Sequence, residues 1–401
     1  MKIIHTGDWH IGKIVNEFSM IDDQRYILNE LIKLINLEKP DVLIIAGDIY
    51  DRSIPPVEAV DLLNEVFSKI LIDNKVKIVA ISGNHDSGER VSFGSKILEK
   101  EGLYIQGIIE DEIKSIRIDD EEGNVNFYMI PYVDPAILRR KFNNPEIRNH
   151  NDAMKAVINR IKPSLNENER NIVVTHGYVT YKRKDDIDKD GENLYELADL
   201  EVSDSERPLS IGGTDLIDSD NFDCFDYVAL GHLHGRQKVG REEIRYSGSL
   251  MKYSFSEINH KKGVVIIEID GNKKINIRQE ELRPKRNMRI IKGPLDELIK
   301  AGLEDCSNRE DYIQAILTDE GEIIDPIGKL RSAYPNIMIL KREEKKDIGT
   351  SLTAASKGYK SKTELELFEE YYDRLGSGEF TEEKKEVIRN VVNEVFREEG
   401  K

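Results

Sequence analysis

Short apolar runs alternate with amphipathic segments through the first half of the chain. The apolar runs are typical of buried strands, and the amphipathic segments repeat apolar residues at helical spacing. The second helix is expected to begin at Pro55-Pro56, because proline in a first turn lacks only an N–H that has no partner there. The alternation predicts an α/β fold. The expected strands are Ile3–His5, Val42–Ala46 and Val76–Ile81, and the expected helices run from Met20 to Leu37 and from Pro55 to about Leu71.

More strand-like runs follow, and the last of them are spaced closely enough to pair directly with one another. They are Val125–Ile130, Ile172–Thr175, Tyr227–Leu230, Ile244–Tyr246 and Val264–Ile269. We therefore expect two packed sheets within one domain that spans residues 1–282.

Three shorter parts are predicted beyond this domain. Residues 283–342 begin with the linker-like Arg283-Pro284-Lys285-Arg286 and continue with a β-α-β-α-β pattern, which predicts a small α+β domain. Residues 343–362 are polar and rich in Gly, Ser and Thr, as flexible linkers are. In residues 363–401 the helical spacing of apolar residues predicts a pair of helices. The apolar positions of this pair are Leu365, Phe368, Tyr372 and Leu375 in the first helix and Val387, Val391 and Val395 in the second.

The apolar stripes of this tail need to be covered. A stripe behind a flexible linker either packs on its own chain or becomes buried in a partner. Both outcomes remain open from the pattern alone, and the reach of the linker favours a partner.

The composition is that of an ordinary soluble protein. Of the 401 residues, 39% are hydrophobic and 34% are charged, which argues against disorder, and no apolar run is long enough to cross a bilayer. The two cysteines, Cys224 and Cys306, form no CxxC pair, so a disulfide framework or a cysteine zinc site is not expected. We expect a cytoplasmic protein without membrane contact.

The formal net charge of −17 argues against a pervasive basic surface that holds nucleic acid. Carboxylates that bind metal are themselves negative, however, and a partner subunit can supply positive charge. Two basic groups are candidates for phosphate contact, although such clusters are more often solvated surface. They are Arg139-Arg140-Lys141 and the set Arg283, Lys285, Arg286, Arg289 and Lys292.

Polar turns follow five of the expected strands. The carboxyl ends of strands in open α/β sheets gather ligands in one crevice, so we expect these turns to converge. The turns hold five of the chain's eight histidines, which chance placement would rarely give. The turns are Asp8-Trp9-His10, Gly47-Asp48, Gly83-Asn84-His85-Asp86, His176-Gly177 and Gly231-His232-Leu233-His234.

Mixed imidazole, carboxylate and amide groups suit borderline divalent metals such as manganese, iron or zinc. The candidate ligands exceed the need of one cation, and a bridging carboxylate would divide them evenly over two. Two cations about 3.5–4 Å apart clamp the attacking and leaving oxygens of a phosphoryl displacement. Taken singly, an Asp after a strand is more often a helix cap, and His5, His150 and His260 are expected to be structural or exposed. The joint occurrence predicts phosphate-ester hydrolysis.

The order D-x-H, GD, GNH(D), H and GHxH resembles the calcineurin-like metallophosphoesterases over roughly the first 270 residues. The resemblance implies a four-layer β-sandwich flanked by helices, and two divalent cations. One cation would be held by Asp8, His10, Asp48 and His234, and the other by Asp48, Asn84, His176 and His232, with Asp48 as the bridge. His85 is left as the catalytic residue, which protonates the departing oxygen or orients the phosphate.

Further stretches of the sequence carry a more specific likeness: Ser203–Pro208, Ile211–Thr214, Phe225–His234, Tyr246–Ser249, Tyr253–Glu257 and Leu367–Tyr372. Together they are similar to the SbcD family of bacterial DNA nucleases. The resemblance implies a manganese-dependent exonuclease and endonuclease that cleaves double-stranded DNA ends and hairpins in repair and recombination. It also implies a DNA-binding capping domain at 283–342, an SbcC-type coiled-coil ATPase bound to residues 363–401, regulation by ATP, and a homodimer within a heterotetramer.

The metal ligands by themselves do not select the substrate. A phosphomonoesterase or nucleotidase for small substrates is the alternative, although it gives no reason for a capping domain and tethered helices. A non-enzymatic scaffold is less favoured, because every position of the metal motif is filled. Asp51 stands where archaeal and eukaryotic relatives of the nuclease family usually carry a histidine, and its role is open.

Overall fold

The computed structural model describes residues 1–113, 115–181, 200–206, 215–304, 307–343, 368–369, 372 and 380–399, with residues 392–399 as backbone alone. The chain divides into two units, Met1–Met288 and Arg289–Lys401. The expected boundary after residue 282 lies slightly before this division. The expected linker from residue 344 onward lies outside the described residues, as do Leu365, Leu375, the stretch Ile211–Thr214 and the side chain of Val395.

The N-terminal unit is built on two six-stranded sheets. The first has the order β16-β15-β1-β4-β5-β6, with a parallel set in β1, β4, β5 and β6. β15 pairs antiparallel with β1, and β16 pairs antiparallel with β15. The bounds are β1 (Lys2–Thr6), β4 (Val42–Ala46), β5 (Lys77–Ile81), β6 (Leu103–Gln106), β15 (Gly263–Ile269) and β16 (Ile275–Glu281).

The second sheet has the order β13-β14-β12-β9-β8-β7. Its four central strands, β14, β12, β9 and β8, are parallel, and an antiparallel strand closes each edge. The bounds are β7 (Ser115–Asp120), β8 (Gly123–Ile130), β9 (Arg170–His176), β12 (Tyr227–Gly231), β13 (Gln237–Val239) and β14 (Arg241–Tyr246).

The two sheets share one apolar core. Ile44 and Val79 of the first sheet belong to the same buried cluster as Phe127, Val174 and Ala229 of the second, and all five are fully buried. Strands that are covered on both faces read as continuous apolar runs, which is the pattern from which they were predicted.

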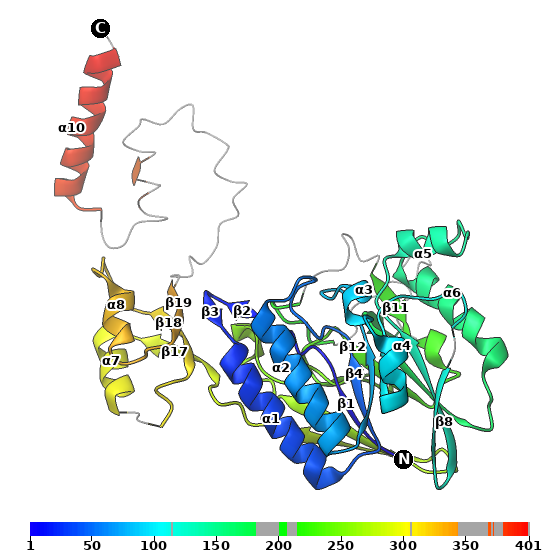
Figure 1. Cartoon of the computed structure of the whole chain (residues 1–401). Helices are drawn as coiled ribbons and strands as arrows, with labels where there is room; N and C mark the ends of the chain where they lie inside the picture. The colour runs from blue at the N-terminus through cyan, green and yellow to red at the C-terminus, as the bar shows by residue number, and fades with distance from the viewer. Residues whose placement is uncertain are drawn as a thin grey trace. The chain divides into compact units, whose positions relative to one another are not determined.

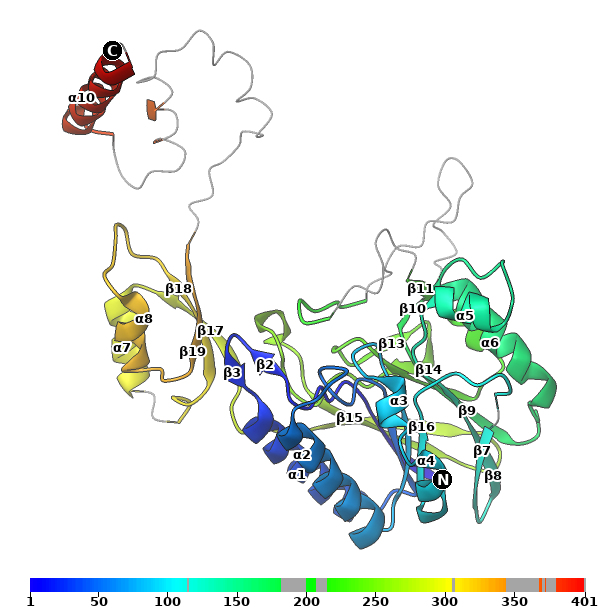
Figure 2. The same cartoon turned by 45° about the horizontal axis from the view of Figure 1, so that its top comes forward.

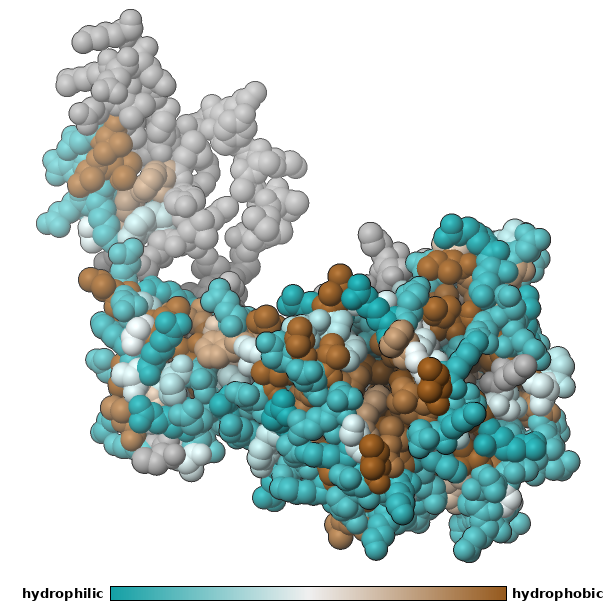
Figure 3. Space-filling model, in the orientation of Figure 1, coloured by the Kyte–Doolittle hydropathy of each residue, from teal (hydrophilic) through white to brown (hydrophobic). Residues whose placement is uncertain are grey.

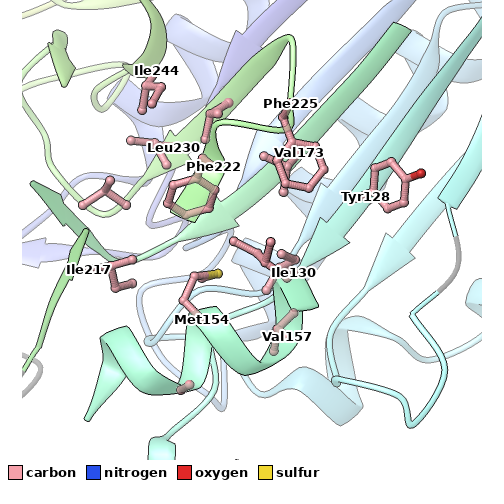
Figure 4. Close-up of a cluster of buried hydrophobic side chains, with 14 of the residues drawn as sticks. Tyr128, Ile130, Met154, Val157, Val173, Ile217, Phe222, Phe225, Leu230 and Ile244 are labelled. Carbon is pink, nitrogen blue, oxygen red and sulfur yellow. The ribbon is translucent and has the colours of Figure 1, made fainter. Parts of the chain in front are cut away.

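Helices cover the outer face of each sheet (Figures 1 and 2). α1 (Ile21–Glu38) and α2 (Val57–Ser68), which continues as the π-helical turn η1 (Lys69–Asp73), lie side by side over the first sheet. α6 (His150–Ile161) covers the second sheet, where Met154 and Val157 join the cluster that contains Val173 and Leu230 (Figure 4). The α/β fold expected from the sequence, with four layers, is confirmed.

Shorter elements complete this unit. They are β2 (Ile14–Val15), β3 (Phe18–Ser19), β10 (Tyr178–Thr180), β11 (Leu216–Asp218), α3 (Gly88–Val91), α4 (Ser95–Leu98), α5 (Pro135–Lys141), and the 3-10 turns η2 (Glu99–Glu101), η3 (Lys162–Ser164), η4 (Ser219–Phe222) and η5 (Phe255–Glu257). α6 begins at a side-chain cap, because Asn149 accepts a hydrogen bond from the Asp152 N–H at 2.8 Å.

The C-terminal unit contains a small three-stranded sheet with the order β17-β18-β19. Leu298, Ile313, Leu330 and Ile337 belong to its own buried cluster, as a separately folded region requires. Its elements follow the β-α-β-α-β order expected from the pattern: β17 (Met288–Gly293), α7 (Leu295–Glu304), β18 (Tyr312–Leu317), α8 (Pro326–Arg331) and β19 (Ile337–Arg342).

Helical residues of the tail contact one another. The rings of Phe368 and Tyr372 lie 6.0 Å and 4.8 Å from the ring of Phe380, which precedes α10 (Glu382–Glu399). Lys385 on α10 pairs with Glu369 at 2.8 Å. Within the described parts of the chain, no helix combines the length and apolar character that crossing a membrane requires.

His5 links the two sheets from within the core. Its Nε2–H donates to the Leu230 carbonyl at 3.2 Å, and its Nδ1 accepts from the Tyr227 hydroxyl at 3.0 Å. Burial lowers the pKa of His5 to about 3 from an ordinary value of 6.5. The imidazole is therefore a neutral structural group, and protonating its Nδ1 would remove the acceptor that the Tyr227 hydroxyl uses.

We predict that His5→Gln reduces the sensitivity of the fold to acid. The unfolded chain takes up a proton here below about pH 6.5, whereas the folded chain does so only near pH 3, so acid favours unfolding of the wild type. Its advantage over His5→Gln should therefore shrink by about 2 kcal/mol between pH 7 and pH 5. Urea unfolding followed by fluorescence of Trp9, the single tryptophan, measures this. Tyr227→Phe keeps the titrating imidazole of His5. If the advantage of the wild type over Tyr227→Phe shrank equally between pH 7 and pH 5, the assignment of the effect to His5 would be contradicted.

Candidate metal centre

The turns after five strands meet at one end of the sandwich. Parallel pairing aligns the carboxyl ends of β1, β4 and β5 in the first sheet and of β9 and β12 in the second. Both sheets therefore contribute side chains to one centre, which contains all seven residues expected as ligands, together with His85. Asp8 and His10 follow β1, Asp48 follows β4, Asn84 and His85 follow β5, His176 ends β9, and His232 and His234 follow β12.

Four of the ligand candidates have a left-handed backbone, with φ of 53° at Asp8, 46° at His10, 49° at Asp48 and 109° at His232. Residues other than glycine rarely adopt this region, at a cost of about 1–3 kcal/mol each, and keep it where the surroundings impose it. Here the His10 N–H donates to the Asp48 carbonyl at 2.9 Å, which joins the first two turns. Such a cluster of strained residues is typical of a functional site.

Two glycines of the motifs are required by close packing. A Cβ on Gly83 would lie 2.2 Å from Asp48 Oδ1, and a Cβ on Gly231 would lie 1.8 Å from the Ala46 carbonyl oxygen. A larger residue at either position would displace Asp48 or the end of β4. These glycines therefore let the turns approach one another closely enough to form a single centre.

The first group of ligand atoms comes from Asp8, His10 and His234, which lie within 4.8 Å of one another. The Nε2 atoms of His10 and His234 are 3.1 Å apart. Burial lowers the pKa of His10 to about 3 and also lowers the pKa of His234, so both imidazoles are neutral and offer a lone pair. Asp8 Oδ2 is buried without a hydrogen-bond partner among the described residues.

The second group comes from Asp48, His176 and His232, whose ligand atoms also lie within 4.8 Å of one another. The His176 Nδ1–H donates to the Ala46 carbonyl at 2.9 Å, which leaves Nε2 facing the centre. Asn84 Oδ1 lies 2.9 Å from His176 Nε2 and 3.2 Å from His232 Nδ1. Asn84 thus supplies an amide oxygen to this group.

Asp48 lies between the two groups. Its Oδ2 is 3.7 Å from His10 Nε2 and 3.4 Å from His176 Nε2. Burial alone would raise the pKa of Asp48, but the neighbouring His176 and other imidazoles hold that pKa well below its usual value. Burial likewise opposes a charge on His176, and Asp48 raises the pKa of this imidazole to about 9. The two side chains are therefore strongly coupled.

The donor set fits divalent cations. It combines imidazole nitrogens with carboxylate and amide oxygens, as sites for borderline metals do. Burial raises the pKa of Asp8 well above its ordinary value, and a cation at this position would favour its charged form. The orphaned atoms Asp8 Oδ2 and His232 Nε2 are further donors that a cation would satisfy.

His85 lies beside both groups without belonging to the ligand sets that they form. Its Nδ1–H donates to the Asp51 carbonyl at 2.9 Å, which leaves Nε2 as the ring nitrogen that this hydrogen bond does not use. Its backbone N–H donates to Asp48 Oδ1 at 2.9 Å, and its ring meets the His10 ring edge-on at 4.7 Å. His85 is therefore held rigidly at the edge of the centre.

Asp51 lies behind His10, where the sequence left its role open. Its Oδ1 is 2.7 Å from Lys13 Nζ and 3.5 Å from His10 Nδ1. Burial alone would raise the pKa of Asp51, but His10 and Lys13 lower that pKa to about 2. Asp51 is therefore a charged neighbour of a ligand imidazole, on the side away from His234.

Sequence reasoning missed the residues that hold the ligand turns from outside. Gln24 Nε2 donates to the His10 carbonyl at 2.7 Å, and the Tyr253 hydroxyl donates to the Trp9 carbonyl at 2.5 Å. Gln24 is on α1 and Tyr253 lies far along the chain from the turn that contains Trp9 and His10. No local sequence motif therefore predicts either contact. His150, stacked on Tyr132 at 6.0 Å, lies outside the centre, as expected.

Family comparison agrees with this arrangement. Residues 1–236 match the calcineurin-like phosphoesterase family, and residues 284–375 match the type 5 capsule protein repressor C-terminal domain family. A crystal structure of a dimetal phosphatase from Danio rerio aligns with 70% of this chain and 96% of its own, at 11% identity and a TM-score of 0.39, which is too distant to bear on function.

Two relatives match the chain from end to end. The SbcD subunit of nuclease SbcCD from Staphylococcus epidermidis is 33% identical over 402 residues, and the protein of the same name from Staphylococcus saprophyticus is 33% identical over 401 residues. Each alignment covers 100% of both chains. The chain therefore belongs to the calcineurin-like phosphoesterase family and, within it, to the SbcD family, and is a metal-dependent phosphodiesterase.

Proposed function

We propose that this chain is the DNA nuclease subunit of an SbcCD-type complex and cleaves double-stranded ends and hairpins as an exonuclease and endonuclease. The observation that carries the proposal is the pair of ligand groups that meet at Asp48. The full-length similarity to proteins named as SbcCD nuclease subunits supports a nucleic acid as the substrate, and DNA is the substrate that we propose.

In this proposal Asp8, His10 and His234 hold one divalent cation. Asn84, His176 and His232 hold the second, and Asp48 bridges the two. When bound, two such cations draw charge from the phosphate and orient the attacking water in line with the leaving oxygen. Because the donors include nitrogen as well as oxygen, they favour Mn²⁺ over Ca²⁺, which binds at sites made of oxygen alone.

His85 is the proposed catalytic residue. The Asp51 carbonyl fixes its Nδ1–H, so Nε2 is the ring nitrogen available to carry a proton for the reaction. From there His85 protonates the departing 3′ or 5′ oxygen of the DNA backbone, or orients the phosphate. The hydrogen bond from the His85 backbone N–H to the buried Asp48 carboxylate keeps this imidazole aligned with the ligand groups.

We predict that His85→Ala lowers the rate of DNA cleavage by at least about 10²-fold, because a positioned proton donor contributes this much. The assay follows an end-labelled blunt duplex with Mn²⁺ beside an aryl phosphate monoester. His260→Ala, whose imidazole lies beside Glu201 outside the centre, should cleave as the wild type does. Monoester turnover with DNA untouched, even after an SbcC-type ATPase and ATP are added, would favour the small-molecule phosphatase instead.

The basic groups named from the sequence are partly neutralised within the chain, so we propose that a partner subunit contributes to DNA affinity. Lys141 pairs with Asp111 at 3.3 Å, and Arg139 donates to the Ile147 carbonyl. In the second set, Arg286 pairs with Asp23 at 2.8 Å, Arg289 with Asp311 at 2.8 Å, and Lys292 with Glu343.

The tail is the proposed binding segment for the SbcC-type ATPase. ATP bound by this partner would regulate DNA cleavage by the chain. Val387 and Val391 on α10 are 60% and 50% exposed and lie one helical turn apart. An exposed apolar pair of this kind matches the helix-in-groove mode of recognition. The polar residues 343–362 would give the tail the reach that such binding needs.

We predict that Val387→Asp with Val391→Asp abolishes association with the SbcC-type ATPase, because two charges cannot enter an apolar groove. Deleting the residues after Arg342 should have the same effect. Both variants should still bind Mn²⁺. Leu303→Asp, on the exposed side of α7, is the matched control. Size-exclusion chromatography of the mixed proteins measures their association. Co-elution of the double variant with the ATPase would contradict the proposal.

A second copy of the chain is the proposed partner for a surface near α2. α2 packs Ala59, Leu62 and Val66 inward yet leaves Val57 and Val60 71% and 44% exposed. Apolar side chains gather on the face around α2, α3 and α4 (Figure 3), where Ile54, Phe93 and Ile97 are also exposed. Patches of this kind mark protein interfaces.

We predict that Val60→Asp converts a homodimer into a monomer, because a buried, unpaired carboxylate opposes association. Sedimentation velocity at several protein concentrations measures the change. Leu37→Asp on α1, where the side chain is 77% exposed, should leave the mass unchanged. A wild type that is monomeric at all concentrations would refute the dimer.

A further inference from the structure

A buried ion pair lies behind the first ligand group. Glu257 is fully buried and Lys262 is 6% exposed, and Glu257 Oε2 lies 2.5 Å from Lys262 Nζ. Removing two charges from water is costly, and an apolar pair of similar volume is often at least as stable. The position of this pair therefore needs a reason other than stability.

Both members of the pair have partners around His234. Lys262 Nζ donates to the His234 carbonyl at 2.8 Å and to Ser249 Oγ at 2.9 Å. Glu257 Oε1 accepts hydrogen bonds from Ser203 Oγ at 2.8 Å and from Ser205 Oγ at 2.5 Å. The polar atoms of the pair are thus directed at the segments that surround a single ligand residue.

Glu257 reaches the imidazole both directly, with Oε1 at 3.4 Å from His234 Nδ1, and through Ser205. The Ser205 Oγ lies 2.7 Å from His234 Nδ1. Because the Glu257 carboxylate only accepts, the Ser205 hydroxyl donates to Glu257, and its oxygen accepts from the His234 Nδ1–H. This order of donors places the imidazole proton on Nδ1 and the lone pair on Nε2, which is the atom that faces His10.

The backbone of His234 is held as well. Its N–H donates to Glu206 Oε1 at 2.6 Å, and Glu206 is fixed in turn by the Ser203 N–H at 3.0 Å. Together with the Lys262 contact to its carbonyl, every polar atom of His234 except Nε2 has a partner from residues 203–206 or 257–262.

We infer that Glu257, acting together with Ser205, is a positioning residue that sets the tautomer and orientation of His234 for the cation of the Asp8–His10–His234 group. Partners of this kind make a ligand imidazole more basic and fix its direction, and their loss usually weakens metal affinity 10- to 100-fold. The inference rests on the proposed metal centre. In the second group, the outer nitrogen of His176 is instead held by the Ala46 carbonyl, at 2.9 Å from Nδ1.

The test is calorimetric titration of metal-free protein with Mn²⁺. Ser205→Ala and Glu257→Gln should weaken one of two Mn²⁺ sites about 10- to 100-fold and leave the other within a few-fold. Ser205→Thr, which keeps the hydroxyl, should retain wild-type affinity. Because Glu257→Gln leaves Lys262 buried without its counter-ion and lowers stability, Ser205→Ala is the decisive variant.

The control breaks a buried ion pair elsewhere in the same unit. Asp120 pairs with the buried Arg170 at 2.5 Å, so Asp120→Asn should lower the melting temperature without changing either Mn²⁺ affinity. Wild-type affinity at both sites in Ser205→Ala would overturn the inference. Equal weakening by Asp120→Asn would also overturn it, because affinity would then only follow stability. A wild type that binds fewer than two Mn²⁺ would instead contradict the two-cation centre itself.

Discussion

The metal centre depends on the register of two sets of parallel strands, because this register places their carboxyl ends at the same height. In the first sheet Thr6 pairs with Ile45 and Ala46 with Ile81, and in the second His176 pairs with Gly231. This register brings the turns to the same height, so short side chains can meet across the gap between the sheets. A slip of one residue would turn every side chain of a strand to the opposite face and separate the ligands.

Burial of charge is the second condition that the fold has to meet. The centre places carboxylates and imidazoles where water is excluded, and such groups are tolerated only with a compensating partner. Asp48 and His176 compensate each other, Asp51 has Lys13, and Glu257 has Lys262. Asp8 lacks a full set of protein partners, which leaves its compensation to a cation. Part of the acidic excess of the chain is therefore internal and does not act on a surface.

Sequence reasoning located the strands and the turns that meet at the candidate centre because both leave local signals. A strand covered on both faces is a continuous apolar run, and each ligand turn directly follows such a run. The outer support of the centre leaves no local signal, since Gln24, Tyr253 and Glu257 reach the ligand turns only after the chain has folded. The same limit applies to the basic residues near 283–292, whose acidic partners are distant in sequence and could not be inferred from the charge pattern.

Each ligand group draws on both sheets: Asp8 and His10 face His234 across the sandwich, and Asp48 faces His176 and His232. A cation in either group therefore cross-links the two halves of the sandwich. Metal binding that is coupled in this way adds to the free energy of folding. In a cell short of the divalent metal, the consequence would be a smaller amount of the protein as well as a slower enzyme, because copies without metal would unfold and be degraded more often.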